Sequence, residues 1–352
     1  MSVASSSIST VVAIDSADTY TTEASSDVHL DEWIAPELVD DNGLLRVGRI
    51  LEWMDVGGAL AATRYCRVPC VTASVNGVDI YRPIEVGEHV SMTARVAHTS
   101  RRSMGVHISL RARGTKTLAE SEVCRAYMTF VPQVGDVKAW TPMSPRDRTL
   151  CREGELRREF RQKLASGDFS DDEFGAPRRE RVSLRTLARD VRRIVLAPDP
   201  SSARSPAMSY VHRIEPVFVR SLNAHGTLYG GTLMRWIENA ASMSARAFTE
   251  TAMIAEGVHG LDFVKAVHKH MFLHTHAMAV RSDRSSVTIR VEVTSENPTT
   301  GETEQSLQGF FTYRPLDRRA SVPELSVHSD TERALNAESA RHLAFARRLR
   351  EE

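Results

Sequence analysis

Two stretches of this chain carry apolar residues at helical spacing on more than one face. The first runs over residues 48–65, and the second begins at the pair Gly230-Gly231. A helix that is apolar on several sides cannot lie on a protein surface, so other elements must enclose it. After the first helix, alternating and β-branched patterns predict strands over residues 70–81, 89–99, 103–113 and 120–131. The pattern predicts an α+β fold in which an antiparallel sheet wraps around a central helix.

The same arrangement of residues occurs twice. Asp55 follows Gly48 by seven residues, and Glu238 follows Gly231 at the same spacing. One offset of 183 residues relates the two pairs, and later segments keep it. A repeat of this length indicates two copies of one domain rather than a short solenoid unit.

The repeat divides the chain into five parts. Residues 1–29 are rich in Ser and Thr and are expected to form a disordered tail. The other parts are a first domain over 30–136, a charged and partly helical linker over 137–205, a second domain over 206–316, and a C-terminal tail and helix over 317–352. In the last part, Ser329 and Glu332 form a capping box that predicts a helix up to Arg350.

Composition argues against several partners and locations. Lys and Arg number 45 and so do Asp and Glu, so no overall basic field attracts nucleic acid or an anionic membrane. No apolar run approaches the roughly 20 residues of a spanning helix. Residues 1–30 contain neither Lys nor Arg, which argues against a mitochondrial or secretory leader. We therefore expect a cytoplasmic chain with no membrane span and no nucleic-acid partner.

The spacing of the four cysteines gives no indication of a disulfide framework or a zinc site. Cys66, Cys70, Cys124 and Cys151 show no Cys-x-x-Cys spacing. In a chain expected to be intracellular, this predicts free thiols rather than a disulfide framework or a zinc site.

The start of the second helix suits chemistry at a carbonyl group. A helix N-terminus presents unpaired N–H groups and favours developing negative charge. Gly230 and Gly231 let a ligand approach that backbone. Seven residues are nearly two helical turns, so Glu238 lies on the same helix face as Gly231.

The motifs Asn223…His225-Gly226…Gly230-Gly231-Thr232-Leu233-Met234…Trp236-Ile237-Glu238 and Val47-Gly48…Leu51…Trp53-Met54-Asp55 carry a family resemblance. Both halves resemble the tandem hotdog-domain acyl-CoA thioesterases. The similarity is greatest to the branch of the cytosolic acetyl-CoA hydrolase and the brown-fat-inducible thioesterase, without the C-terminal START domain of that branch. The resemblance implies two hotdog domains, each a sheet around one helix.

The resemblance also implies an activity and a site. The family hydrolyses acyl-CoA to free acid and CoA, with water as second substrate and no metal or other cofactor. Its active sites form between two hotdog domains, which implies that Asn223 of the second faces Asp55 of the first. Asp55 would activate water or attack directly, and the N–H groups of Gly230 and Gly231 would bind the carbonyl oxygen.

The equivalent pair of residues, Asp40 and Glu238, departs from the Asn and carboxylate pattern of the family. Asp40 stands where the second half has Asn223, and it would face Glu238 beside Gly48. Two carboxylates and no amide indicate a second site that is vestigial or structural. For every one of these residues a plainer role stays open: the carboxylates can be buried and hydrogen-bonded, and Asn223 can cap a turn.

Two further sets of residues have two interpretations each. The predicted hairpin turns carry Arg101, Arg102 and Ser103, and Arg284 and Ser285, which are either CoA contacts or solvated turn residues. The second set is His268, His270, His274 and His276. On a continuous strand these histidines would share one face, but no carboxylate accompanies them at a standard spacing, so we expect no metal there.

Two other functions remain open. One is an inactive acyl-CoA or nucleotide sensor that keeps the fold. The other is a different hotdog acyl-CoA enzyme, such as a hydratase or dehydratase. The resemblance further implies a homo-oligomer, a trimer of double-hotdog chains. Acyl chain length is not readable from the sequence.

Overall fold

A computed structural model of the chain describes residues 26–114, 119–166, 184 and 203–351. Most of the predicted tail and the second part of the predicted linker lie outside these residues. In the first half the elements are β1 (Val28–Trp33), η1 (Pro36–Leu38), α1 (Val47–Cys66), β2 (Cys70–Ile80), β3 (His89–Ser100), β4 (Ser103–Arg113), β5 (Glu120–Pro132) and α2 (Pro145–Ser166).

The second half repeats this order. Its elements are η2 (Pro206–Ser209), β6 (Val211–Pro216), η3 (Val219–Ser221), α5 (Gly230–Thr249), β7 (Met253–Phe263), β8 (Phe272–Ser282), β9 (Val287–Glu296), β10 (Thr303–Pro315) and α6 (Asp330–Glu351). The central helix and the four strands predicted for the first domain are confirmed to within about a residue at each end.

The sequence pattern missed the first strand of each domain. β1 begins at Val28, two residues inside the predicted tail, and its buried residues alternate with Asp31 and other exposed positions. It is six residues long and lies at the edge of the sheet, where β3 is its one partner among the described strands. A short, charged edge strand carries a weak pattern, because solvent faces it on one side.

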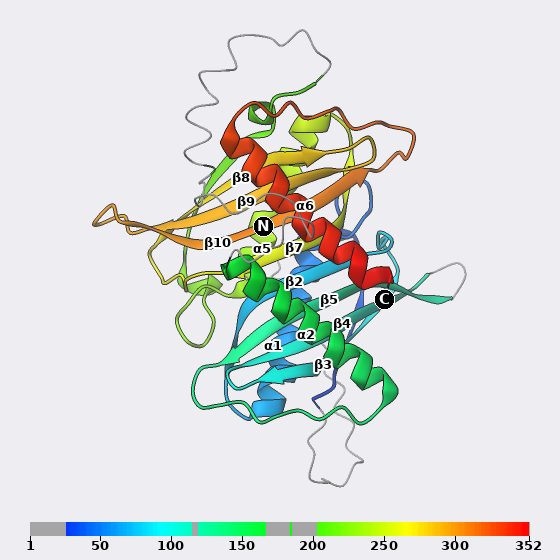
Figure 1. Cartoon of the computed structure of the whole chain (residues 1–352), viewed down its shortest axis with the longest axis vertical. Helices are drawn as coiled ribbons and strands as arrows, with labels where there is room; N and C mark the ends of the chain where they lie inside the picture. The colour runs from blue at the N-terminus through cyan, green and yellow to red at the C-terminus, as the bar shows by residue number, and fades with distance from the viewer. Residues whose placement is uncertain (1–25, 115–118, 167–183, 185–202, 352) are drawn as a thin grey trace, which may run out of the picture.

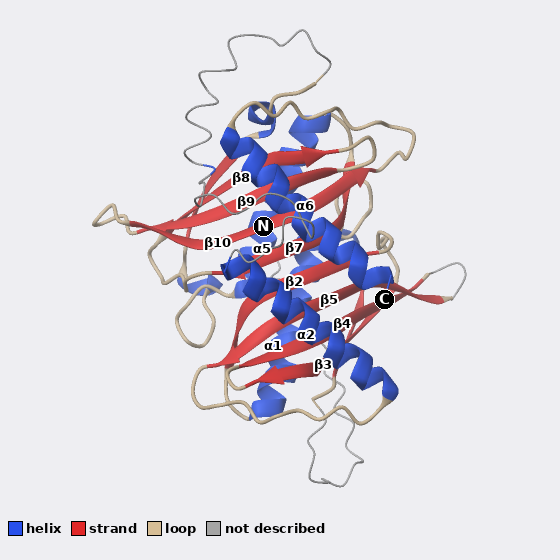
Figure 2. Ribbon diagram, viewed as in Figure 1, coloured by secondary structure: helices blue, strands red, loops and turns tan. Residues whose placement is uncertain are grey.

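All strands join in one antiparallel sheet of ten, in the order β1-β3-β4-β5-β2-β7-β10-β9-β8-β6. The two halves meet where β2 pairs with β7, from Ser74 opposite Asp262 to Asp79 opposite Gly257. Figures 1 and 2 show α1 and α5 behind this sheet and α2 and α6 across its near face. The prediction of an α+β fold with two hotdog domains is confirmed.

The two central helices pack against each other, and glycine makes the crossing possible. A Cβ on Gly48 would lie 3.0 Å from the Cα of Arg235, and one on Gly231 would lie 3.0 Å from the Cα of Glu52. Each helix N-terminus therefore rests on the second turn of the other helix. One hydrophobic core includes buried residues of both halves, such as Leu51 and Met234.

The outer helices are held by specific contacts. The predicted capping box starts α6: the Ser329 hydroxyl accepts a hydrogen bond from the Glu332 N–H at 3.1 Å, and Glu332 accepts one from the Ser329 N–H at 2.9 Å. Near their ends α2 and α6 meet, with the rings of Phe160 and Phe345 stacked at 4.0 Å. No helix in the described ranges has the length and apolar content needed to cross a bilayer.

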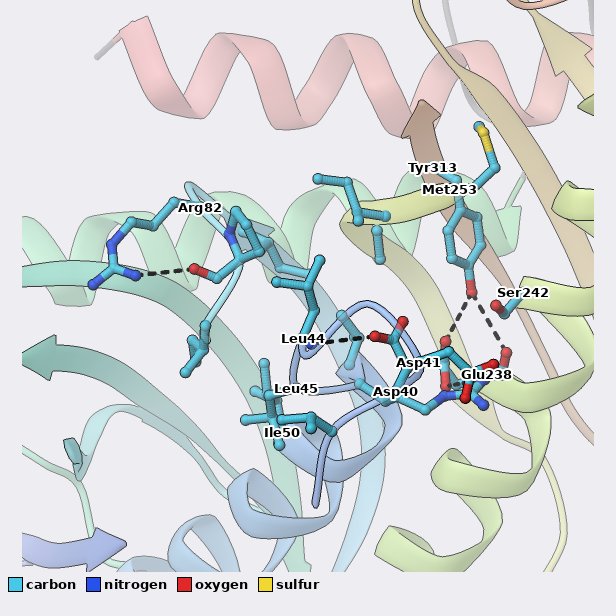
Figure 3. A pocket seen from close by; sticks show the side chains of 18 of the residues that line it. Asp40, Asp41, Leu44, Leu45, Ile50, Arg82, Glu238, Ser242, Met253 and Tyr313 are labelled. Carbon is cyan, nitrogen blue, oxygen red and sulfur yellow. Dashed lines mark hydrogen bonds and ion pairs between the residues drawn. The ribbon is translucent and has the colours of Figure 1, made fainter. Parts of the chain in front are cut away.

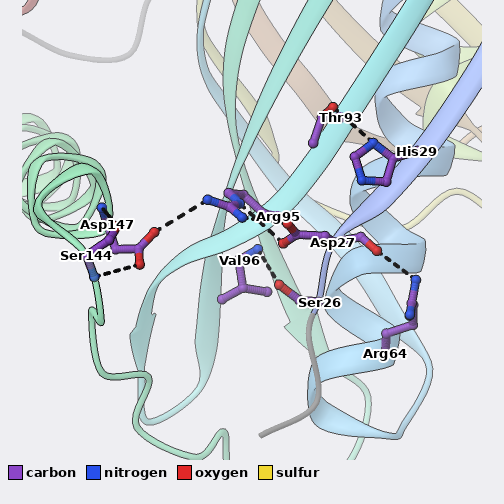
Figure 4. A network of polar contacts seen from close by, with 9 residues as sticks. All are labelled: Ser26, Asp27, His29, Arg64, Thr93, Arg95, Val96, Ser144 and Asp147. Atoms are coloured by element: carbon purple, nitrogen blue, oxygen red, sulfur yellow. Dashed lines mark hydrogen bonds and ion pairs between the residues drawn. The ribbon is translucent and has the colours of Figure 1, made fainter. Parts of the chain in front are cut away.

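A polar network ties α2 to the first domain (Figure 4). The Arg95 guanidinium on β3 pairs with Asp27 at 2.5 Å and with Asp147, in the first turn of α2, at 3.4 Å. The Ser144 hydroxyl accepts a hydrogen bond from the Asp147 N–H at 3.0 Å, which caps the helix. The start of α2 is thereby fixed against β3.

Candidate active site

Asp55 lies on α1 where this helix meets the second domain. Its side chain is buried, with 3% of the residue exposed. Oδ2 accepts a hydrogen bond from the backbone N–H of Gly231 at 2.7 Å, and Oδ1 accepts one from the Thr72 hydroxyl. A carboxylate of the first domain is thus held by the N-terminus of the central helix of the second.

The glycine pair allows this close approach. A Cβ on Gly230 would lie 3.1 Å from Oδ2 of Asp55. The N-terminus of α5 favours a negative charge at this place. The structure differs from the sequence-based expectation for Gly231, because its N–H is directed at Asp55 rather than kept for a substrate carbonyl.

The environment of Asp55 changes its acidity. Burial raises its pKa from the ordinary 3.8 to about 6. The hydrogen bonds from Thr72 and Gly231 lower the pKa, and the nearby Glu52 carboxylate raises it. Asp55 is therefore ionised at neutral pH, and its basicity is close to that of an effective general base at that pH.

Sequence reasoning missed two residues beside Asp55. Thr72 on β2 binds the carboxylate, and the Tyr229 ring lies so close to Gly231 that a Cβ there would be 3.0 Å from its Cε1. Burial, followed by the charges of Asp55 and Glu52, raises the pKa of Tyr229, which keeps the phenol protonated. A comparison of the repeats was the available signal for Thr72, because Ala255 occupies the equivalent position in the second half.

Asn223 lies in the turn before α5, where its side chain caps the backbone. Oδ1 accepts hydrogen bonds from the N–H groups two and four residues later, at 2.9 and 3.2 Å, and Nδ2 donates to the Thr227 hydroxyl at 2.9 Å. Asp40 makes the same two backbone contacts in the first half, at 2.8 and 3.1 Å. The described contacts of the Asn223 side chain do not include Asp55, so the turn-capping interpretation fits this geometry.

Glu238 occupies the equivalent place in the second half. It is 3% exposed and accepts hydrogen bonds from Gly48 N–H, from Arg46 at 3.3 Å and from the Tyr313 hydroxyl at 3.3 Å. Burial raises the pKa of Glu238, while Arg46, Tyr313 and Gly48 lower it. This carboxylate is held by an ion pair that Asp55 does not have among the described residues.

A cavity of about 320 Å³ is lined by Glu238 (Figure 3). Both Asp40 and Glu238 line it, together with apolar residues and the arginines Arg46, Arg82 and Arg246. The two repeats differ at one equivalent position, which is Arg46 in the first half and Tyr229 in the second. Arg46 lines the cavity at Glu238, whereas the Tyr229 ring packs against Gly231. The structure thus brings Asp40 and Glu238 to one cavity, whose described lining residues lack a counterpart of Thr72.

The residues considered for CoA binding lie in two hairpin turns. Arg101, Arg102 and Ser103 are at the turn from β3 to β4, and Arg284 and Ser285 are at the turn from β8 to β9. The Ser103 and Ser100 hydroxyls lie 2.7 Å apart, and the Ser285 hydroxyl donates to Asp283 at 2.7 Å. The backbone carbonyls of Arg101 and Arg284 accept hydrogen bonds from the N–H groups of Val137 and Val322, at 2.8 and 3.0 Å. Contact of these turns with CoA stays a prediction.

The histidine-rich segment is not one continuous strand. β8 begins at Phe272, and His270 has a φ of 67° in the turn before it. His274 and His276 lie on β8, where His212 of β6 joins them at the sheet edge. The condition under which the four histidines would share one strand face is therefore not met, because the turn interrupts the alternation.

Both halves of the chain match one family of known proteins. Residues 42–119 and 225–302 both match the family model described as the thioesterase superfamily. A 125-residue segment is 30% identical to the uncharacterized acyl-CoA thioester hydrolase YkhA of Bacillus subtilis, covering 35% of this chain and 73% of that protein.

Two longer alignments reach mammalian proteins. One, at 27% identity, is with the acetyl-coenzyme A thioesterase of Rattus norvegicus and covers 71% of this chain. The other, at 23% identity, is with the human cytosolic acyl coenzyme A thioester hydrolase and covers 85% of this chain and 77% of that protein. The chain spans 42% of the length of the rat protein.

Proposed function

This chain belongs to the thioesterase superfamily, and from that premise we propose that it hydrolyses acyl-CoA thioesters to free acid and CoA. The observation that carries the proposal is the buried carboxylate of Asp55, set 2.7 Å from the N–H of Gly231 at a helix N-terminus. Such a carboxylate has both the basicity and the position for attack on a carbonyl carbon.

In the proposed reaction, Asp55 accepts a proton from water as the water attacks the thioester carbonyl. Direct attack by the carboxylate is the second route, and it would leave an acyl-enzyme anhydride for water to hydrolyse. In both, the N-terminus of α5 at Gly230 stabilises the oxyanion. The C–S bond then breaks, and the CoA thiolate takes up a proton.

We assign supporting roles to the neighbours of Asp55. Thr72 fixes the carboxylate through its hydroxyl, and Tyr229 shields it from bulk water. Asn223 acts here as a positioning residue, because its side chain caps the turn that leads into Gly230.

We propose that hydrolysis occurs at one site per chain. The alternative carboxylate, Glu238, is already paired with Arg46, which lowers its basicity relative to a buried carboxylate without that partner. Asp40 places a second acidic group at that cavity. Among the described residues, the Glu238 carboxylate is therefore already engaged by the Arg46 guanidinium as well as by the Tyr313 hydroxyl.

The remaining parts of the proposal rest on the family. The expected substrate is an acyl-CoA, the expected assembly is three double-hotdog chains, and no metal or redox cofactor is needed for the chemistry. A cytoplasmic location agrees with the name of the human relative.

Release of CoA is the decisive measurement. The chain would be assayed by a thiol reagent with acyl-CoAs from acetyl to palmitoyl, beside Asp55→Asn and Glu238→Gln. We expect turnover that Asp55→Asn abolishes and Glu238→Gln leaves within about twofold. Saturable acyl-CoA binding without release would instead indicate a sensor, and hydration of an enoyl-CoA would indicate the hydratase class.

A further inference from the structure

A second cluster of reactive side chains lies outside the candidate active site, between the sheet and α2. We propose that His98 of β3 and Cys151 and Glu155 of α2 form a binding site for Zn²⁺. The sequence alone predicted no zinc site, because these residues follow no standard spacing along the chain.

The ligand atoms are spaced for one cation. The Cys151 Sγ lies 4.0 Å from the His98 Nδ1 and 3.8 Å from the Glu155 Oε1, and all three lie within 4.8 Å of one another. Ligands at about 2.0–2.3 Å from a tetrahedral zinc ion are roughly 3.5 Å apart. Small side-chain rotations therefore close the observed separations.

The elements are arranged to bring these groups together. Cys151 and Glu155 are four residues apart and share one face of α2. Gly154 lets that face approach β3, since a Cβ there would lie only 2.7 Å from the Cβ of His98. His98 lies directly after an irregularity in β3, because the pairing of β3 with β4 shifts register between Val96 and His98.

The charges permit a divalent cation. A thiolate and a carboxylate neutralise the two positive charges of Zn²⁺. Zinc binds cysteine as the thiolate and histidine through a neutral ring nitrogen.

The site has three protein ligands, which leaves a fourth position for water. One ligand comes from the sheet and two come from α2, the helix that leads out of the first domain. Zinc would therefore fasten α2 to β3 at a second point, about one turn beyond the contact of Asp147 with Arg95. We expect zinc to raise the melting temperature of the chain, since it binds only the folded arrangement.

Cobalt provides a spectroscopic test with the full chain. Cys66 and Cys70 lie with their sulfur atoms 3.2 Å apart and form a competing pair of thiols. The parent for the experiment is therefore Cys66→Ser/Cys70→Ser, which retains Cys151. Titration with Co²⁺ alone should give one ion per chain, tetrahedral visible bands and a thiolate-to-cobalt charge-transfer band, all removed by added Zn²⁺.

Variants then assign the ligands. Cys151→Ser should remove the charge-transfer band, and His98→Gln and Glu155→Gln should weaken cobalt binding by about tenfold or more. Glu155 is exposed, so Glu155→Gln keeps the test valid even if another variant fails to fold. Absence of the band in the parent, its persistence in Cys151→Ser, or unchanged affinity in Glu155→Gln would overturn the proposal.

Discussion

At the scale of single residues, the Asp55 carboxylate is buried, and its hydrogen bonds only partly offset the cost of burying its charge. Two hydrogen-bond donors face its carboxylate, but its contacts with the described residues include no cationic partner. Its equivalent, Glu238, has Arg46. The repeat therefore contains one carboxylate with a cationic partner and one for which the described contacts include none, although both are 3% exposed.

The pH dependence of hydrolysis should report Asp55. Because its pKa is about 6 and the ionised form is the base, kcat/KM should rise with pH and level off above roughly pH 7. Thr72→Val removes a hydrogen bond that lowers this pKa, so the acid limb should move to higher pH. An acid limb that does not move in Thr72→Val would contradict the assignment.

Asp55→Asn should separate activity from stability. Loss of the base should reduce kcat by about 10²–10⁴-fold. The pKa of Asp55 is higher in the folded chain than its ordinary 3.8, so its contribution to stability falls as pH rises from about 4 to about 6. At pH 8 the variant should therefore be as stable as the parent or more stable, by up to about 3 kcal/mol in urea unfolding. A strongly destabilised variant would indicate a structural role instead.

The two possible roles of Asn223 predict opposite results for Asn223→Asp. Asp40 caps the equivalent turn with the same two hydrogen bonds, so an Asp at 223 should preserve the turn. If Asn223 only positions α5, kcat should stay within about fivefold, while Asn223→Ala should lose more. A loss as large as that of Asp55→Asn would show that the amide group itself acts on substrate or water.

At the scale of elements, the crossing of α1 and α5 depends on two glycines. Gly48→Ala and Gly231→Ala each place a Cβ about 3.0 Å from a backbone Cα of the other helix. Both should lose about 1–3 kcal/mol in urea unfolding from overpacking. Only Gly231→Ala should also reduce turnover, because its N–H holds Asp55.

The control for these variants is Gly77→Ala. Gly77 lies on β2, and a Cβ added there would meet no atom of the described residues within 4 Å beyond its chain neighbours. Its substitution should therefore change stability by no more than about 0.5 kcal/mol. Equal losses in all three variants would mean that the close crossing is not the cause.

At the scale of the whole molecule, the two halves should unfold together. They share one ten-stranded sheet through β2 and β7 and one hydrophobic core. Calorimetry should give a single transition whose calorimetric and van't Hoff enthalpies agree. Two resolved transitions would show that each hotdog domain is stable without the other.

The sequence determined the repeat, the apolar central helices and four of the five strands in the first domain. These follow from local periodicity and spacing, which survive in any arrangement of the domains. The first strands were missed because their pattern is short and charged. The sequence pattern alone does not show where the histidine segment turns, because the interruption is a positive φ at His270.

Only the tertiary structure decided what surrounds each carboxylate. Thr72 is 17 residues from Asp55 and Gly231 is 176 residues away, yet both bind it. Arg46 reaches Glu238 across 192 residues. The sequence supplies these groups, but burial and charge depend on which helix end lies against which side chain, and the crossing of α1 and α5 sets that.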